Sequence, residues 1–329
     1  MALTKVTTGT IADDSIQSLK NRNLIINGAM QVWQRNLTQT STGYGCVDRW
    51  KNTVSGTTTF SQDTASLPTG FEYALRWTTG ASSSYGQSRQ YLETSTVKIL
   101  RGRTLTASSY VKVSGSYSGY VTWEIAYSTI SDSAAGNTWV QLTETSVVTA
   151  SALDASSDYK RISCNVAIPS NAVGLYIGIV PSATQASGQW VSVTGVQLEV
   201  GDVATPFEHE SYSEALQKCR RYYRKSALDS FVAVVYTPNG DTRCTPLHIG
   251  PMRASPTISP ANHTLHSINH GYTGENVNTP TVQWNFSVEG NNLGYTMKIN
   301  QNGSYAGYSD TVISAGVNGP GTITFDAEL

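Results

Sequence analysis

Apolar and polar side chains alternate along several short segments of this chain, and this period of two is the strongest constraint on its fold. The segment Val121–Tyr127 is apolar at every second position: Val121, Trp123, Ile125 and Tyr127. Successive side chains of an extended strand point to opposite faces, whereas a helix would space its apolar residues by three and four. We therefore expect these four side chains to face a hydrophobic core.

Similar segments recur between Gly, Asn, Asp and Pro residues, at the spacing typical of a two-sheet sandwich. They are Phe71–Trp77, Leu105–Val113, Trp139–Thr149, Tyr159–Ile168, Leu175–Val180 and Trp190–Val200. Charged residues form only 14% of the chain, and the abundance of Ser, Thr, Gly and Asn suits short strands joined by polar turns. The sequence predicts a mainly β protein with a jelly-roll-like β-sandwich over residues 27–200.

One segment has helical spacing instead. Its apolar residues are Tyr212, Ala215, Leu216, Cys219, Tyr222 and Tyr223. Ser211 followed by Glu214 is a capping-box signature, and the basic residues that come later suit the C-terminal end of a helix. Residues 201–226 are therefore predicted to form a linker and a short amphipathic connector helix.

A chain of 329 residues exceeds the size at which one core usually stops growing, so a second domain is expected. We place a distal C-terminal β domain at residues 227–329. Its predicted strands are Phe231–Tyr236, Thr281–Val288, Leu293–Ile299 and Gly321–Ala327.

Residues 1–26 have too few apolar side chains to close a core alone. These residues are Val6, Ile11, Ile16 and Leu19, separated by polar residues. We expect this segment to be an arm that becomes ordered only against a partner.

Bulk properties restrict the partners. The formal net charge of -1 gives no general attraction to nucleic acid or to an anionic membrane, and no apolar run approaches the length of a membrane-spanning helix. The N-terminus does not resemble a secretory signal, so folding in a cytosol is expected. Four widely spaced cysteines, Cys46, Cys164, Cys219 and Cys244, indicate reduced packing residues, and no cofactor is predicted.

Enzymatic motifs are missing from the sequence: there is no Gly-x-Ser-x-Gly elbow, no Walker loop and no His-Glu-x-x-His. A glycosidase would need two facing carboxylates, which the sequence alone cannot nominate. His263, His266 and His270 are weak candidates for a metal site on a symmetry axis, and the simpler interpretation is solvated loop histidines, so no metal is assigned. A basic cluster is more simply a solvated helix face or a subunit contact than a nucleic-acid site: Lys218, Arg220, Arg221, Arg224 and Lys225.

Exposed aromatic rings bind sugars by stacking on their apolar faces. Four tyrosines lie among Asn, Gln, Ser and Gly in the distal region and are the glycan-binding candidates: Tyr272, Tyr295, Tyr305 and Tyr308. Trp284 alternates with Val282 and Phe286, which indicates a core position.

Three blocks of sequence occur in an order that is known from one family. They are Asn23–Arg35 followed by Val47–Trp50, then Gly195–Glu208, then the helix with Cys219–Tyr223. Together they resemble phage tail-fibre and related virion proteins that contain a carbohydrate-binding-module-like sandwich. Leu3–Ile16 is similar to the attachment ends of such fibres, and Pro251–Thr257 is similar to a segment of their C-terminal regions.

The resemblance implies a non-enzymatic structural fibre subunit of a bacteriophage particle, made in the host cytoplasm and located in the virion. It implies a homo-oligomer, expected to be a trimer, whose N-terminal arm docks on other tail or head proteins and whose distal region contacts a host cell-surface polysaccharide. Two alternatives stay open: a purely structural tail adaptor or head fibre, and a polysaccharide depolymerase. The motif residues also have structural interpretations, with Trp33 and Trp50 as core anchors, and Arg35, Asp48 and Arg49 paired around them.

Overall fold

The computed structural model describes residues 21–81, 84–115, 117, 120–133, 138–143, 148–149, 158–181, 185–227, 247–248, 251–261, 283–291, 294–302 and 322–329. The chain divides into two compact units, Met1–Leu216 with Leu329, and Gln217–Glu328. The division falls within helix α4 (Tyr212–Arg220).

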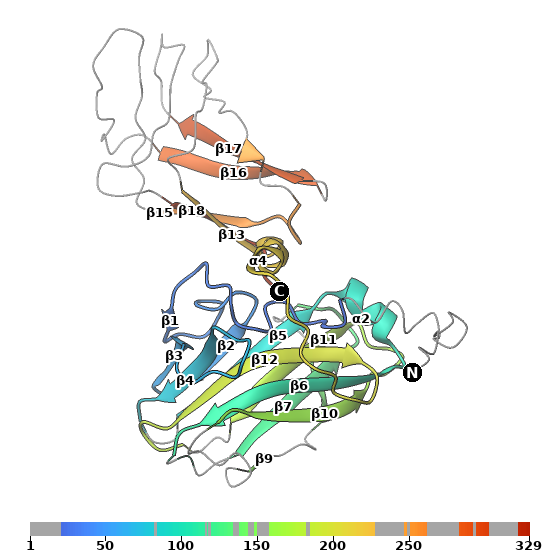
Figure 1. Cartoon of the computed structure of the whole chain (residues 1–329). Helices are drawn as coiled ribbons and strands as arrows, with labels where there is room; N and C mark the ends of the chain where they lie inside the picture. Colours follow the sequence, from blue (N-terminus) through green and yellow to red (C-terminus); the bar gives the residue numbers. More distant parts are fainter. Residues whose placement is uncertain are drawn as a thin grey trace, which may run out of the picture. The chain divides into compact units, whose positions relative to one another are not determined.

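Unit 1 is a β-sandwich of two antiparallel sheets (Figure 1). The first, the β12 sheet, has the spatial order β1 (Thr38–Gln39), β3 (Thr58–Asp63), β4 (Ala74–Thr79), β12 (Trp190–Val200), β6 (Thr104–Val113) and β10 (Lys160–Ala167). The second, the β11 sheet, has the order β2 (Lys51–Ser55), β5 (Tyr85–Leu92), β11 (Gly174–Pro181), β7 (Tyr120–Ser128) and β8 (Val140–Thr143), with β9 (Val148–Thr149) also paired to β7. Helix α2 (Thr94–Leu100) follows β5 and buries Val97 and Leu100.

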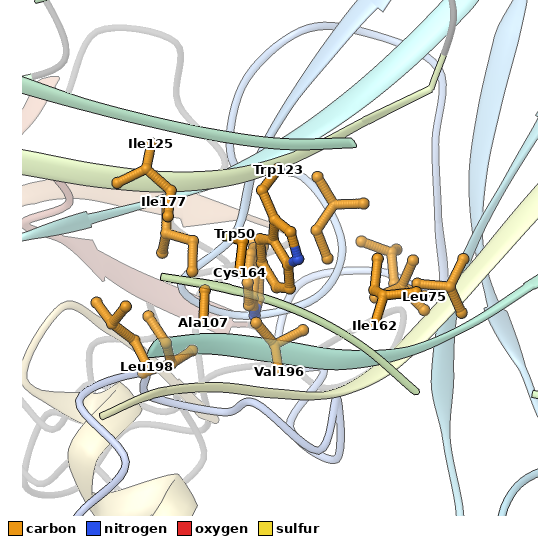
Figure 2. Close-up of a cluster of buried hydrophobic side chains, with 14 of the residues drawn as sticks. Trp50, Leu75, Ala107, Trp123, Ile125, Ile162, Cys164, Ile177, Val196 and Leu198 are labelled. Atoms are coloured by element: carbon orange, nitrogen blue, oxygen red, sulfur yellow. The ribbon is translucent and has the colours of Figure 1, made fainter. Parts of the chain in front are cut away.

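The core lies between the inward faces of these sheets, and side chains of both contribute to it (Figure 2). Trp123 and Trp50 are among its largest fully buried side chains, with exposed fractions of 1% and 0%. Val121 and Ile125 are buried as well, and Tyr127 packs against the same cluster. The predicted sandwich and the predicted inward face of Val121–Tyr127 are confirmed.

The first sequence block forms a hydrogen-bonded network around Asn27. The Asn27 amide donates to the carbonyl oxygens of Val32 and Asp48, at 3.0 and 3.1 Å, and its side-chain oxygen accepts from the amides of Gln31 and Val32. Trp50 donates its indole N–H to the Asn27 carbonyl. Because Asn27 is fully buried, this block is part of the core structure.

The predicted pairing of the motif charges is found in part around the same network, between Arg35 and Asp48. Arg35 Nε lies 3.8 Å from Asp48 Oδ1, and Arg49 donates to the carbonyl of Tyr91 at 2.9 Å. Trp33 packs against the core and donates its indole N–H to the Met30 carbonyl. These contacts agree with the interpretation of Trp33 and Trp50 as core anchors.

The segment after β12 returns across the outer face of the β12 sheet. Phe207 packs against Phe71 with ring centroids 5.0 Å apart, and the Glu208 amide donates to Gln197 Oε1. The Glu208 carboxylate accepts hydrogen bonds from the backbone amides of Asn21 and Asn23, at 2.7 and 2.8 Å. We call these contacts of Glu208 the Glu208 clasp.

The boundary of the predicted N-terminal arm at residue 26 needs correction. Leu24 N–H donates to the Leu198 carbonyl, Ile26 N–H donates to Gln90, and Ile25 is buried. Residues 21–26 therefore belong to the sandwich, because their backbone groups are bonded to its strands. Val6, Ile11, Ile16 and Leu19 lie outside the described residues.

The connector helix is shorter than predicted. Ser211 and Glu214 form the expected capping box, with Ser211 N–H bonded to the Glu214 carboxylate and Glu214 N–H bonded to Ser211 Oγ. The helix ends at Arg220, and Tyr223 begins β13 (Tyr223–Ala227), so Arg224 and Lys225 lie on a strand and not on a helix face. The backbone there pairs with β18 (Thr322–Asp326), and this pairing replaces the helical hydrogen bonds.

The described part of unit 2 contains two three-stranded antiparallel sheets. One has the order β13, β18 and β15 (Thr257–Ala261), and the other has β14 (Leu247–His248), β17 (Gly294–Asn302) and β16 (Gln283–Asn291). The Arg253 amide donates to the Arg221 carbonyl at 2.8 Å, which joins two of the family-like sequence blocks. Of the predicted strands, Phe231–Tyr236 lies outside the described residues.

Three cysteines, Cys46, Cys164 and Cys219, are buried, and Cys244 lies outside the described residues. Burial raises the pKa of the Cys46 thiol to about 11, so this thiol remains protonated and inert at neutral pH. No helix in the described ranges has both the length and the hydrophobicity needed to cross a membrane.

Replacing Trp123 with alanine tests the assignment of the core. The free energy of unfolding in urea should fall by about 3–5 kcal/mol, because a large buried ring is lost and a cavity remains. Thr122→Ala, one position along the same strand, is the control and should change the value by less than about 0.5 kcal/mol. A loss below about 1 kcal/mol for Trp123→Ala would place the ring outside the core.

Candidate functional site

The outer face of the β11 sheet has a row of four register positions on adjacent strands, three of which carry charged residues. Lys51 of β2 lies opposite Arg89 of β5, Arg89 lies opposite Gly178 of β11, and Gly178 lies opposite Glu124 of β7. Their sequence neighbours Gln90, Ile177 and Ile125 occupy the alternate, inward positions, and the two isoleucines belong to the core. The row therefore faces away from the core, as the pleat of a strand requires.

Arg89 and Glu124 form a bidentate ion pair across the central strand. Arg89 Nε and Nη2 donate to the Glu124 carboxylate at 2.8–3.0 Å. The side chains are only 22% and 16% exposed, so water screens the pair weakly. Burial opposes the charge on Arg89, but Glu124 together with Tyr176 and Tyr91 outweighs this effect and raises the Arg89 pKa above its usual value.

Gly178 permits this pairing. A Cβ atom at Gly178 would lie 2.9 Å from Arg89 Cγ, closer than side-chain atoms normally approach. Arg89 therefore reaches Glu124 over a strand position that has no side chain. Glycine weakens a strand interior, and here it serves the close approach of two long side chains.

Three aromatic rings adjoin the ion pair. Tyr91 and Tyr176 are cross-strand neighbours with centroids 5.4 Å apart, and Trp139 contacts them edge-on at 5.5 and 4.9 Å. The two tyrosines are buried, at 4% and 5% exposed, whereas Trp139 is half-buried. The tyrosines thus support Trp139, which is the ring of the three that reaches solvent.

The rings and charges form one cluster. Tyr176 donates its hydroxyl to Glu124 at 2.8 Å, and the Arg89 guanidinium lies 4.8 Å from the Tyr176 ring centroid. Burial first, and then the charge of Glu124, raise the Tyr176 pKa, so the phenol keeps the proton that it donates. We call this set the outer-face cluster: Lys51, Arg89, Tyr91, Glu124, Trp139 and Tyr176.

The outer face of the opposite sheet is organised differently. Arg76 bonds Asp63 at 2.7 Å and stacks on Trp190, with 4.1 Å to the ring centroid. Asp63 also accepts from Ser192, which contacts Tyr159. Arg76 is paired with Asp63, and Lys112 of β6 lies in the same row but opposite Ser192, so Arg76 and Lys112 are not direct register partners. We interpret this row as structural.

The outer-face cluster has a binding geometry more than a hydrolytic one. Among the described residues of the β11 sheet, Glu124 is the sole acidic side chain in a strand, so a facing pair of carboxylates is not formed there. Its oxygens are already bonded to Arg89 and Tyr176. Within the described ranges no three His, Cys, Asp or Glu side chains form a metal-binding group.

The sequence-predicted site residues are not among the six residues of the outer-face cluster. Tyr295 is on β17, opposite Gly290. The other glycan candidates, Tyr272, Tyr305 and Tyr308, and the three histidines, His263, His266 and His270, lie outside the described residues. These assignments remain predictions.

The sequence analysis missed the outer-face cluster, although part of its signal was present. Glu124 occupies an outward position in Val121–Tyr127, and Tyr176 alternates with the core residues Leu175 and Ile177. Glu124 and Tyr176 could have been predicted from the sequence as outward-facing residues, because each alternates with apolar residues of a predicted strand. Arg89 and Lys51 lie on strands that the pattern did not predict.

Comparisons with known proteins give only distant similarities. The sequence matches no protein-family model and no curated protein. Among solved structures, the enzymatically active domain of bacteriophage CBA120 tailspike protein 4 is 12% identical, and the match covers 55% of this chain and 22% of that chain with a TM-score of 0.37. This chain therefore matches about a fifth of the tailspike's length.

Two carbohydrate-binding modules are similar to the same degree. TmCBM61, solved with β-1,4-galactotriose, is 13% identical, with 55% of this chain and 100% of that chain covered and a TM-score of 0.32. The C-terminal family 22 module of Clostridium thermocellum Xyn10B is 14% identical, with 51% and 95% covered and a TM-score of 0.34. The assignment of the sandwich rests on the strand order of the two sheets.

Changing Glu124 to glutamine tests the ion pair. It should lower the free energy of unfolding by about 1–3 kcal/mol, because Arg89 then remains a largely buried charge without a counter-ion. Chemical denaturation measures this, with the exposed Glu72→Gln as the matched control. Equal values for the two variants would mean that the pair adds no stability.

Proposed function

We propose that this chain is a non-enzymatic fibre subunit of a bacteriophage particle and that its sandwich binds a host-surface glycan through the outer-face cluster. The observation that carries the binding proposal is Trp139, a half-buried ring supported edge-on by Tyr91 and Tyr176. Ordered aromatic rings beside fixed polar groups are the usual components of sugar sites.

The virion role is supported by the sequence resemblance. Its three blocks occur in the expected order, and the fold explains them structurally as the Asn27 network, the Glu208 clasp and the joined segments of unit 2. In this proposal, residues 1–20 dock on other tail or head proteins, and the chain acts as a homotrimer in the virion. Several weak sites held in one rigid oligomer would raise avidity by about 10²–10⁴.

Binding without cleavage fits the chemistry of the cluster. A glycosidase places two carboxyl groups about 5–10 Å apart, one of them with a proton to give. The carboxylate oxygens of Glu124 already accept hydrogen bonds from a guanidinium and a phenol. The depolymerase alternative is therefore disfavoured at this face.

Trp139→Ala should abolish or strongly reduce retention on immobilised bacterial surface polysaccharides, because the exposed stacking surface is removed. Trp190→Ala is the matched control, since Trp190 is a half-buried ring beside an arginine on the opposite sheet. A combined Tyr272, Tyr305 and Tyr308 alanine variant tests the distal alternative. If only that variant loses binding, the site lies in the distal domain, and if the wild-type protein is retained by no polysaccharide, the structural alternative of adaptor or head fibre is favoured.

Deleting residues 2–20 should leave a folded oligomer that is no longer incorporated into particles, because the bonds from Asn21 and Asn23 to Glu208 are kept while the proposed docking arm is removed. Circular dichroism and light scattering check the fold and the oligomer, and particle assembly with the truncated subunit checks docking. An unfolded monomer would show that the arm belongs to the core.

A further inference from the structure

The outer-face cluster places two cations directly opposite each other. Lys51 and Arg89 are register partners on β2 and β5. Side chains at such positions start only about 4.5–5.5 Å apart, and like charges there destabilise the sheet. A nearby anion would offset the repulsion between these two cations.

Glu124 compensates Arg89 and has little capacity left for Lys51. It accepts three contacts from Arg89 and one from Tyr176. In the described residues Lys51 has no acidic partner, and its Nζ lies 5.7 Å from the Tyr91 ring centroid. With two positive groups and one negative group, the row has one net positive charge.

The Lys51 ammonium is the main donor of the row for a bound anion. Arg89 is bonded to Glu124 through Nε and Nη2 and also hydrogen-bonds the Tyr91 side chain, whereas the Lys51 ammonium carries three N–H donors. The two cations lie on neighbouring strands, beside Trp139 and its supporting tyrosines. The two groups together suit an oxyanion on a bound ring.

Building on the proposed function, we infer that the glycan bound at this face carries an anionic substituent, a carboxylate or a phosphate, held between Lys51 and Arg89. The sugar ring packs against Trp139, and the anion supplies the negative charge that the row lacks. Burial, and then the charge of Arg89, lower the Lys51 pKa, as expected for a cation without a counter-ion. An anion bound there would reverse this shift.

A second lysine provides an internal comparison. Lys112 of β6 lies over Tyr159 at 5.8 Å, almost the same contact as Lys51 makes with Tyr91. Its partner on β12 is Ser192, and not a cation. A lysine that lies over a tyrosine ring therefore does not by itself indicate an anion-binding site. Lys51 differs from Lys112 because another cation, Arg89, lies directly opposite it.

The test uses the full-length protein on an array of bacterial surface polysaccharides. Each acidic polymer is present in its native form, after reduction of its carboxyl groups to alcohols, and after removal of its phosphate groups. The retained polymer should be an acidic one, and one of the two treatments should lower its binding at least about tenfold, which identifies the anion as carboxylate or phosphate.

Variants of Lys51 and Lys112 test whether Lys51 is the residue that binds the anionic group. Lys51→Met should weaken binding of the native acidic polymer about tenfold, Lys51→Arg should retain most of it, and Lys112→Met should leave it unchanged. Lys51→Met should not lower the midpoint of urea unfolding, because it removes a like-charge repulsion. This readout separates lost recognition from lost folding.

The outcomes distinguish the two proposals. Binding that depends on Trp139 but is equal for native and neutralised polymers, or that is unaffected by Lys51→Met, overturns the anionic assignment and leaves the proposed glycan site intact. Retention by no polysaccharide overturns both.

Discussion

The shared core of the two sheets is the constraint on which the rest of the sandwich depends. Both sheets are stable because their inward side chains, such as Trp123 and Leu198, are removed from water together. The pleat then forces the alternate residues outward. Five residues of the outer-face cluster lie on strands whose alternate side chains face the core, so the core sets the spacing of these five, and Trp139 directly precedes β8.

The period of two was enough to predict the sandwich and the inward face of Val121–Tyr127, because that pattern is local. It failed for β5, where the inward residues Ser88 and Gln90 are polar. Ser88 bonds Asn52, and Gln90 bonds the backbone of Ile26. These inward positions of β5 are therefore stabilised by hydrogen bonds, whereas the inward positions of other strands bury apolar side chains. The cluster itself depends on a strand order, β2-β5-β11-β7, that joins distant segments and leaves no local signature.

The family-like sequence blocks have a structural explanation in this fold. Asn27 satisfies backbone groups inside a turn, and Phe207 packs against Phe71 over the β12 sheet. Such residues maintain the fold and do not identify the ligand. Sequence motifs and binding residues therefore lie in different places, and recognising the first did not locate the second.

The Glu208 clasp has a mechanical consequence. The carboxylate of Glu208, beyond β12, accepts hydrogen bonds from the backbone of Asn21 and Asn23, at the start of the described part of the sandwich. A pulling force applied between Asn21 and Glu208 loads these bonds before it loads the sheets. The force then passes across a few short hydrogen bonds at one point, and less shear reaches the strands that carry Arg89 and Glu124.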